Sequence, residues 1–274
     1  MLHLKITRDA EIMRKTARNS NIILIIATVL GFITAIIAAF YISKSITLQV
    51  GGEPTEIAKI TEQVAAGNLD IQTKTATGIY ASIQLMIEHL QVINYEKEQQ
   101  DWLKTGQAQI NEKTSGEQDI ITLAKNIISY LTTYVAAQVG LFYLVQSDSK
   151  LKIIASYAYT MNANTPNEFN FGESLVGQAA LEQKIISITQ TPAECPLIIR
   201  SGLTGSLPQY VLLLPFLYEN KLKGIIEIGS TKKLTEIQRS FLELVMPNIG
   251  VAVNTADSRT KMKILLEQSQ QQSD

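Results

Sequence analysis

The sequence predicts a multidomain chain. It should hold a transmembrane α-helix, an α-helical four-helix bundle that forms as a dimer with a coiled-coil linker, and an α/β domain whose antiparallel sheet is flanked by helices. Three observations predict this order: an uncharged apolar run over residues 21–42, two apolar heptad patterns after it, and strand patterns bounded by helical ones in the C-terminal half. At 274 residues the chain is long enough for real cores.

The composition excludes several classes of function. The 24 Lys and Arg residues balance 25 Asp and Glu, so the total charge gives no indication of nucleic-acid binding. The single cysteine, Cys195, forms neither an intramolecular disulfide nor a metal site by itself, and this usage suits a reducing compartment. The two histidines, His3 and His89, are far apart. We therefore expect no metal and no cofactor.

Residues 21–43 are predicted to form a transmembrane helix. The run NIILIIATVLGFITAIIAAFYI carries no charge and matches the roughly 20 residues that cross a bilayer. Tyr41 suits a membrane interface, and Lys44 marks the exit. A cleaved signal peptide, the alternative, would have a shorter apolar core and a small-residue cleavage site. Residues 1–20 then form an N-terminal stub.

The charges around this span favour an N-terminus in the cytoplasm, because basic residues concentrate on the cytoplasmic side. The domains that follow are nevertheless expected in the cytoplasm, below a single pass through the inner membrane. The two agree if residues 1–20 end a longer extracytoplasmic region, so we expect the chain to be a fragment. The basic residues are Lys5, Arg8, Arg14, Lys15 and Arg18 before the span, and Lys44 and Lys59 after it.

A pair of helices is predicted after the span, within residues 44–97. Gly51-Gly52 is interpreted as a pliable joint, since glycine disfavours a continuous rigid helix, and Pro54 fits the first turn of the next helix. That helix stops at Gly67-Asn68, and the second opens at Thr77-Gly78. Apolar residues step by three and four along both. The residues expected to relay a signal are Gly51, Gly52, Pro54, Ile57, Ile60, Val64, Ile79, Ile83, Met86 and Leu90.

Two segments of this pair, PTEIAKITEQVAAGNLDI and TGIYASIQLMIEHL, resemble the HAMP domains of chemotaxis receptors and sensor kinases. The acidic-Glu-Ile-Gly signature that usually opens the second helix is reduced to Thr77-Gly78-Ile79. The resemblance implies a parallel dimeric four-helix bundle that relays helix motion from the membrane. A passive dimer stalk is the alternative, because heptads form stalks as well. His89 lacks the adjacent acid and nearby proline of a phosphoacceptor and is expected on the bundle surface.

Residues 98–116 are predicted to be a helical linker that continues the two-stranded helix with weakened core positions. Its main apolar residues are Trp102, Leu103 and Ile110, and a break in the helix is plausible at Ser115-Gly116.

The C-terminal domain is predicted over residues 117–258, and residues 259–274 form a helix end and tail. A helix over 120–137 precedes two antiparallel strands. A crossing loop, a short helix and one more strand follow. Two strands around Glu219-Asn220 and a long helix close the domain. The strand segments are VGLFYLVQ, KLKIIASYAY, KIISI, YVLLLPFLYE and KLKGIIEIGS, and the short helix covers 173–183.

This domain resembles a GAF domain through FGESLVGQA, PFLYENKLKGIIEIGS and the closing helix, and the joint before it is similar to that of hybrid sensor histidine kinases. The resemblance implies a small-ligand or protein-interaction module that dimerises through its first and last helices. The sequence pattern of GAF domains that bind cyclic nucleotides is matched at Asn220-Lys221 but not at Leu234 or Gln238-Arg239. This disfavours a cyclic nucleotide as the ligand. Cys195 is followed by proline rather than histidine, which disfavours bilin attachment.

A pocket for an unknown small ligand, if present, is expected between the sheet and the crossing loop at 160–210. The alternative, which we favour, is a solid core. The residues expected to line the pocket are Phe169, Phe171, Leu175, Ile199 and Tyr210, since small-molecule sites are mostly apolar.

No catalytic motif is visible, so no enzyme is expected. VGGEPTE begins like the GG[DE]EF signature of nucleotide cyclases, but Pro54 stands where the second acid is needed. We interpret the chain as the input and relay portion of a bacterial membrane receptor. It would form a parallel homodimer in the bilayer and signal to a histidine kinase or response regulator absent from this chain. The alternatives are a complete ligand-binding membrane adaptor for a separate partner and a passive dimerisation scaffold.

Overall fold

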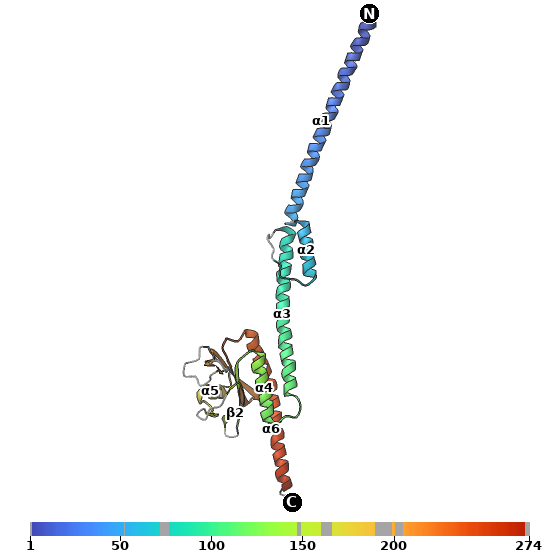
Figure 1. The fold of residues 1–274 in the computed structure, drawn as a ribbon. Helices are drawn as coiled ribbons and strands as arrows, with labels where there is room; N and C mark the ends of the chain where they lie inside the picture. Colours follow the sequence, from blue (N-terminus) through green and yellow to red (C-terminus); the bar gives the residue numbers. More distant parts are fainter. Residues whose placement is uncertain are drawn as a thin grey trace. The chain divides into compact units, whose positions relative to one another are not determined.

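The computed structural model describes residues 2–51, 53–71, 77–146, 149–159, 166–189, 199–200 and 205–271. The chain divides into two compact units, residues 1–97 and 98–274, which we describe separately. Figure 1 labels the helices of both units and strand β2.

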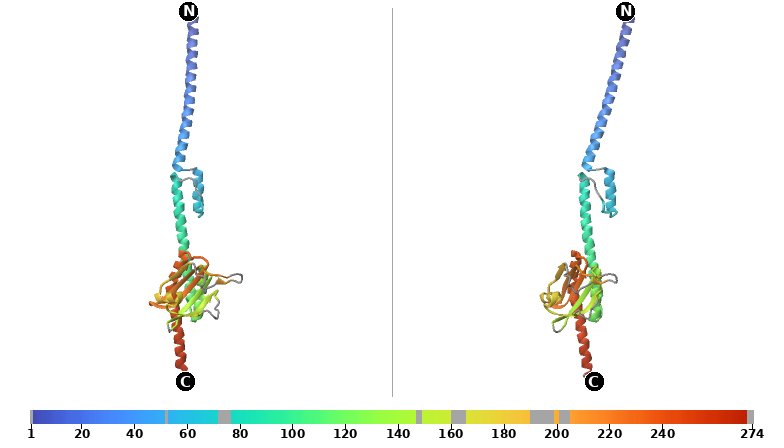
Figure 2. Two further views of the ribbon diagram at one scale, coloured as in Figure 1. Left: turned by 90° about the vertical axis from the view of Figure 1, so that its left-hand side faces the viewer. Right: turned by 60° about the vertical axis from the view of Figure 1, so that its left-hand side comes forward.

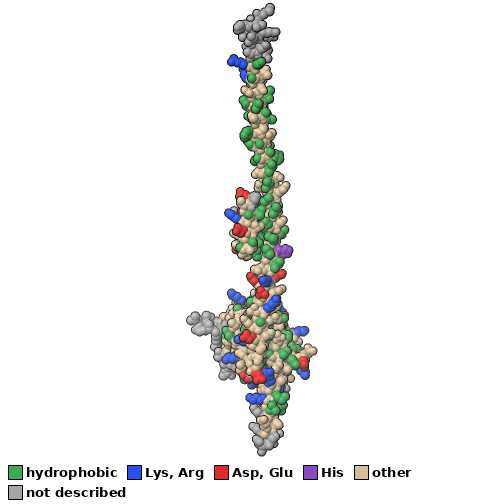
Figure 3. Space-filling view, turned by 90° about the vertical axis from the view of Figure 1, so that its right-hand side faces the viewer, with side chains coloured by type: hydrophobic (Ala, Val, Ile, Leu, Met, Phe, Trp, Pro, Cys, Tyr) green, Lys and Arg blue, Asp and Glu red, His purple; other side chains and the backbone are tan. Residues whose placement is uncertain are grey.

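Helix α1 (Leu2–Val50) dominates the first unit. Hydrophobic side chains follow its apolar stretch, and all of those described are exposed, as Figure 3 shows for one face. By length and composition this helix is apolar enough to cross a membrane, a criterion that an N-terminal signal sequence also meets. A helix is therefore present over 21–43, and it is longer than the predicted span because the polar residues on both sides continue it.

Helix α2 (Pro54–Ala65) packs on the first half of α3 (Gly78–Thr114). Pro54 stands in the first turn of α2, where its missing N–H removes no helical hydrogen bond. Ile60, Tyr80 and Ile87 form a small buried core between the two helices. Gln91 on α3 also donates a hydrogen bond from Nε2 to the Leu69 carbonyl at 2.7 Å. The partly buried residues around this core are Ile57, Val64, Ile71 and Ile83.

The second unit is built on a six-stranded antiparallel sheet among the described residues, in the order β3-β2-β1-β8-β7-β4. Every strand segment expected from the sequence is present, and the short strand β3 was not anticipated. The bounds are β1 (Val139–Val145), β2 (Lys150–Tyr157), β3 (Glu168–Asn170), β4 (Ile186–Thr189), β7 (Tyr210–Tyr218) and β8 (Lys221–Ser230). Two further short strands, β5 (Ile199–Arg200) and β6 (Gly205–Ser206), pair with each other.

Helices cover both faces of this sheet, as the views in Figures 1 and 2 show. Helices α4 (Ile120–Tyr134) and α6 (Glu236–Gln271) enclose one core against one face, and α5 (Ser174–Glu182) lies on the other. Successive strand residues face opposite sides. Phe142 therefore belongs to the α4/α6 core, whereas Leu141 and Tyr143 belong to the α5 core.

Helix α6 lies close to the sheet. A Cβ added at Gly250 would be 2.0 Å from the Leu217 carbonyl oxygen of β7, so only glycine fits without a shift. The helix also contains Pro247, which has no N–H to donate to the Glu243 carbonyl one turn earlier.

The C-terminal half of α3 belongs to this second unit. Ile110 is fully buried in the α4/α6 core, and Trp102 and Leu103 pack against it. The weak heptad pattern at 98–116 thus has a physical reason within one chain, because its apolar residues pack on α4 and α6. The predicted break is present: α3 ends at Thr114, and Asp119 caps α4 by accepting hydrogen bonds from the N–H groups of Ile121 and Thr122, both at 3.0 Å.

Candidate functional sites

The glycine joint lies where the end of α1 meets the start of α3. Gly51 has φ +79° and Gly78 has φ +61°, backbone conformations that favour glycine. A Cβ at Gly51 would be 1.8 Å from the Thr77 carbonyl oxygen, and a Cβ at Gly78 would be 2.2 Å from that of Gln49. The two backbones are thus in direct contact at a point that admits no larger side chain. Gly52 lies outside the described residues.

The other predicted relay residues on α2 and α3 divide into a buried set between the two helices and an exposed set on α3. Ile57, Ile60, Val64 and Ile83 contribute to the core between α2 and α3. Ile79, Met86 and Leu90 are instead exposed, at 53%, 44% and 36%. Together with Ile93 they form an apolar stripe at heptad spacing that nothing within the chain covers among the described residues.

A second glycine contact lies within the second unit, where the C-terminal half of α3 packs on α4 and α6. A Cβ at Gly106 would lie 2.6 Å from ring atoms of both Phe241 and Tyr134. The ring of Trp102 stacks on that of Tyr134 with centroids 4.6 Å apart, and the Tyr134 hydroxyl donates to the Trp102 carbonyl at 2.7 Å. The Tyr130 hydroxyl donates to the Gly106 carbonyl at 3.1 Å. Burial raises the pKa of Tyr130 to about 12 and also raises the pKa of Tyr134. Both hydroxyls are therefore protonated hydrogen-bond donors at neutral pH.

A polar pair lies at the edge of the core on the α5 face of the sheet, with Tyr143 buried and Glu227 half-buried. The Tyr143 hydroxyl on β1 donates a hydrogen bond to Glu227 Oε2 on β8 at 2.6 Å. Removal from water raises the pKa of Glu227 above its ordinary 4.5, because burial disfavours the charged carboxylate. Burial first, and then the charge of Glu227, also raise the pKa of Tyr143. Phe169 meets the Tyr143 ring edge-on at 5.9 Å.

The five residues predicted to line a pocket do not share one side of the sheet. Phe169 and Phe171 pack against the α5 core. Tyr210 lies in the α4/α6 core, because its even position on β7 points it to the other face. Leu175 on α5 is 50% exposed. The Ile199 side chain lies outside the described residues.

The Tyr143–Glu227 pair was missed by the sequence analysis, although a signal existed. Glu227 is the one acid within GIIEIGS, the largely apolar second part of a strand, and a lone acid there indicates a carboxyl removed in part from water that needs a partner. Tyr143 is the partner that the register provides, since β1 pairs with β8 and both side chains face α5.

These observations define an α/β domain of three layers. Its described residues contain no group of His, Cys, Asp and Glu that would hold a metal ion. The GAF domain family model matches residues 117–254, which is half of the chain, and the chain therefore belongs to the GAF domain family. Membership indicates a signal-sensing module. No curated protein matches the chain.

Solved structures similar to the chain include three of known source. The GAF domain of a phosphoenolpyruvate-protein phosphotransferase from Coxiella burnetii is 15% identical with a TM-score of 0.49, over 58% of this chain and 96% of that one. A putative GAF sensor protein from Burkholderia vietnamiensis is 14% identical with a TM-score of 0.48, over 59% and 94%. The free methionine-R-sulfoxide reductase from Neisseria meningitidis is 15% identical with a TM-score of 0.45, over 59% and 91%. The family assignment rests on the model match.

Proposed function

We propose that the chain is the input and relay portion of a membrane-anchored receptor. A HAMP-like helix pair and the GAF domain would act in series in the cytoplasm, below the inner membrane, on an output such as a histidine kinase. The apolar length of α1 supports the membrane anchor, and the α2–α3 pair after it supports the HAMP assignment.

One observation carries the relay: α3 contributes to two cores. Tyr80 and Ile87 at its start are buried against α2, and Ile110 near its end is buried in the GAF core. A change in how the first half of α3 packs therefore alters an element of the sensory domain, and the reverse holds as well, because coupling between two sites is reciprocal. A transmitted signal requires that the two packings differ in stability.

The proposed receptor works as a parallel homodimer. The exposed stripe of Ile79, Met86 and Leu90 has the heptad spacing that a second copy of α3 would cover. Burial of these residues in a dimer would remove apolar area from water and stabilise the helix pair.

Disulfide crosslinking between copies tests this proposal in membranes. In a Cys195→Ser background, Met86→Cys places a thiol on the stripe, and Glu88→Cys places a matched thiol off it on the same exposed helix. We expect rapid crosslinking at 86 and slow crosslinking at 88. Equal rates at the two positions would contradict a dimer through this stripe.

The relay is tested by adding Ile110→Ala, which disturbs the buried α3 contact in the GAF core. We expect the crosslinking rate at 86 to change, whereas Gln107→Ala on the same helix should leave it unaltered. An unchanged rate at 86 in both variants would support the passive scaffold.

A further inference from the structure

A groove with a volume of about 390 Å³ lies where the end of α3, the start of α4 and the middle of α6 meet. Its buried floor includes Leu123 and Ala256. Asn111, Asn248 and Arg259 are among the polar residues around it. An apolar floor with a few converging polar groups is the usual construction of a small-molecule site. We propose that this groove binds a small oxyanion, a carboxylate or a phosphate, through Arg259.

The charge in the groove is unbalanced. Arg259 is the charged residue that lines it, and no acid does so among the described residues. The guanidinium makes one long hydrogen bond, from Nη1 to the Gly116 carbonyl at 3.4 Å, and no ion pair with a described carboxylate. Its remaining N–H donors form the planar fork that matches carboxylate and phosphate oxygens.

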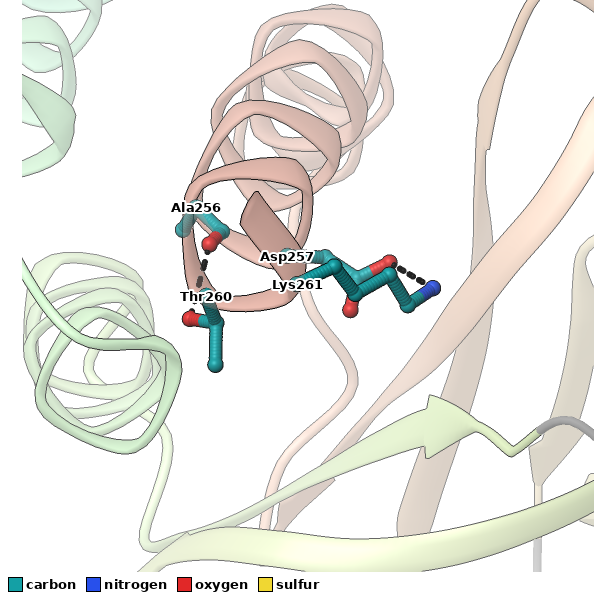
Figure 4. A network of polar contacts seen from close by, with 4 residues as sticks. All are labelled: Ala256, Asp257, Thr260 and Lys261. Carbon is teal, nitrogen blue, oxygen red and sulfur yellow. Dashed lines mark hydrogen bonds and ion pairs between the residues drawn. The ribbon is translucent and has the colours of Figure 1, made fainter. Parts of the chain in front are cut away.

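The acid closest in sequence is already paired elsewhere. Asp257 accepts from Lys261 Nζ at 2.8 Å, and Figure 4 shows this pair on the other side of α6 from Ala256, which lines the groove. The helical turn thus separates Asp257 from the groove, and Arg259 is left as a cation without its neighbouring anion.

The side-chain amides add neutral donors. Asn248 Nδ2 donates to Asn111 Oδ1 at 3.2 Å, which leaves the Asn111 amide N–H groups to donate elsewhere. The Ser115 hydroxyl already donates a hydrogen bond to the Asn111 backbone carbonyl at 2.6 Å. The donors available to a ligand are therefore those of Arg259 and the amides, and this set favours an acceptor-rich anion over a cation.

A bound oxyanion would connect the end of α3 to α6. If the chain relays signals through α3, as proposed above, such a ligand would regulate that relay. The binding itself does not depend on the relay, so the two proposals fail separately.

Binding is tested with the full chain in a maltoside detergent, by isothermal titration calorimetry with succinate, inorganic phosphate and the neutral succinamide. We expect succinate or phosphate to bind and succinamide not to bind. Succinate alone identifies a carboxylate ligand, and phosphate alone identifies a phosphate ligand.

Three variants make the test specific. Arg259→Gln should weaken binding roughly tenfold or more, because it removes the positive charge and the two parallel N–H donors that the guanidinium offers to an oxyanion. Asn248→Asp should weaken binding as well, because it places a carboxylate beside the anion. Lys263→Gln removes an exposed cation of the same helix outside the groove and should bind like the wild type. No binding of either anion to the wild type, or equal binding by Arg259→Gln, overturns the proposal.

Discussion

The helix pair and the GAF domain are stabilised to very different extents within one chain. Ile60, Tyr80 and Ile87 are the buried residues of the α2–α3 core, whereas the GAF domain buries two extensive clusters on the two faces of its sheet. The pair also leaves Ile79 and Met86 exposed on its own helix. The difference indicates that the GAF domain has far more buried apolar contact to stabilise it than the helix pair has within one chain.

The largest effect on stability is expected from truncation of a buried side chain in the GAF core. Phe142 is fully buried and its ring lies 5.1 Å from that of Phe216. Phe142→Ala should lower the free energy of unfolding of the domain by about 3–5 kcal/mol, because it leaves a cavity. Chemical denaturation measures this. Leu181→Ala, at a position 59% exposed, should change it by less than about 0.5 kcal/mol.

Truncation of a buried side chain in the helix pair should unfold the α2–α3 pair alone. Ile87→Ala should cost about 2–5 kcal/mol, which is enough to unfold a pair with so small a core. Hydrogen exchange should show lost protection in α2 and unchanged protection in β7 and β8, with exposed Leu85→Ala as the control. Loss of protection in both units would show that they unfold together, and the contrast between them would fail.

The contact of α3 with the GAF domain gives a third prediction. Gly106→Ala should destabilise this contact by about 1–3 kcal/mol, since the new methyl would lie 2.6 Å from two rings and force them apart. Tryptophan fluorescence reports the change, because Trp102 stacks on one of these rings. Lys104→Ala, on the exposed side of the same turn, should leave the emission unaltered.

The smallest effect concerns pH. The pKa of Glu227 is raised above 4.5 in the folded protein, so the folded protein holds a proton at Glu227 more tightly than the unfolded chain does. Its contribution to stability is therefore fully present below pH 4.5 and is lost as the pH rises through the folded pKa. Glu227→Gln should flatten this part of the stability profile while staying within about 1 kcal/mol of the wild type at pH 7. Glu219→Gln, at an exposed position, should leave the pH dependence of stability as it is in the wild type.

Local patterns predicted most of the fold. The strand segments of the sheet other than β3, the helix at Pro54 and the break after residue 114 all follow from periodicity, proline and turn residues near them in sequence. What the sequence did not reveal depends on contacts between distant segments. The packing of Trp102 on Tyr134 joins positions 32 residues apart, and the helical pattern alone did not distinguish this partner from a second copy of α3.

The candidate sites were harder to predict for the same reason. Tyr210 was predicted to line the pocket because it ends the crossing loop and small-molecule sites are mostly apolar, but the strand register decides its side, and a shift of one residue reverses it. The glycine joint was predicted from Gly51-Gly52 alone. Its contact with Thr77-Gly78 required the arrangement of α1 and α3.

The close approach of α6 to β7 restricts how sequences of this kind can vary. With the Leu217 carbonyl 2.0 Å from where a Cβ would stand, position 250 accepts no side chain unless the helix moves away from the sheet. Related chains that keep this helix on this strand should therefore retain glycine at 250, and a larger residue there should accompany a displaced helix. A single position thus records, in sequence, whether the closing helix lies directly on the sheet.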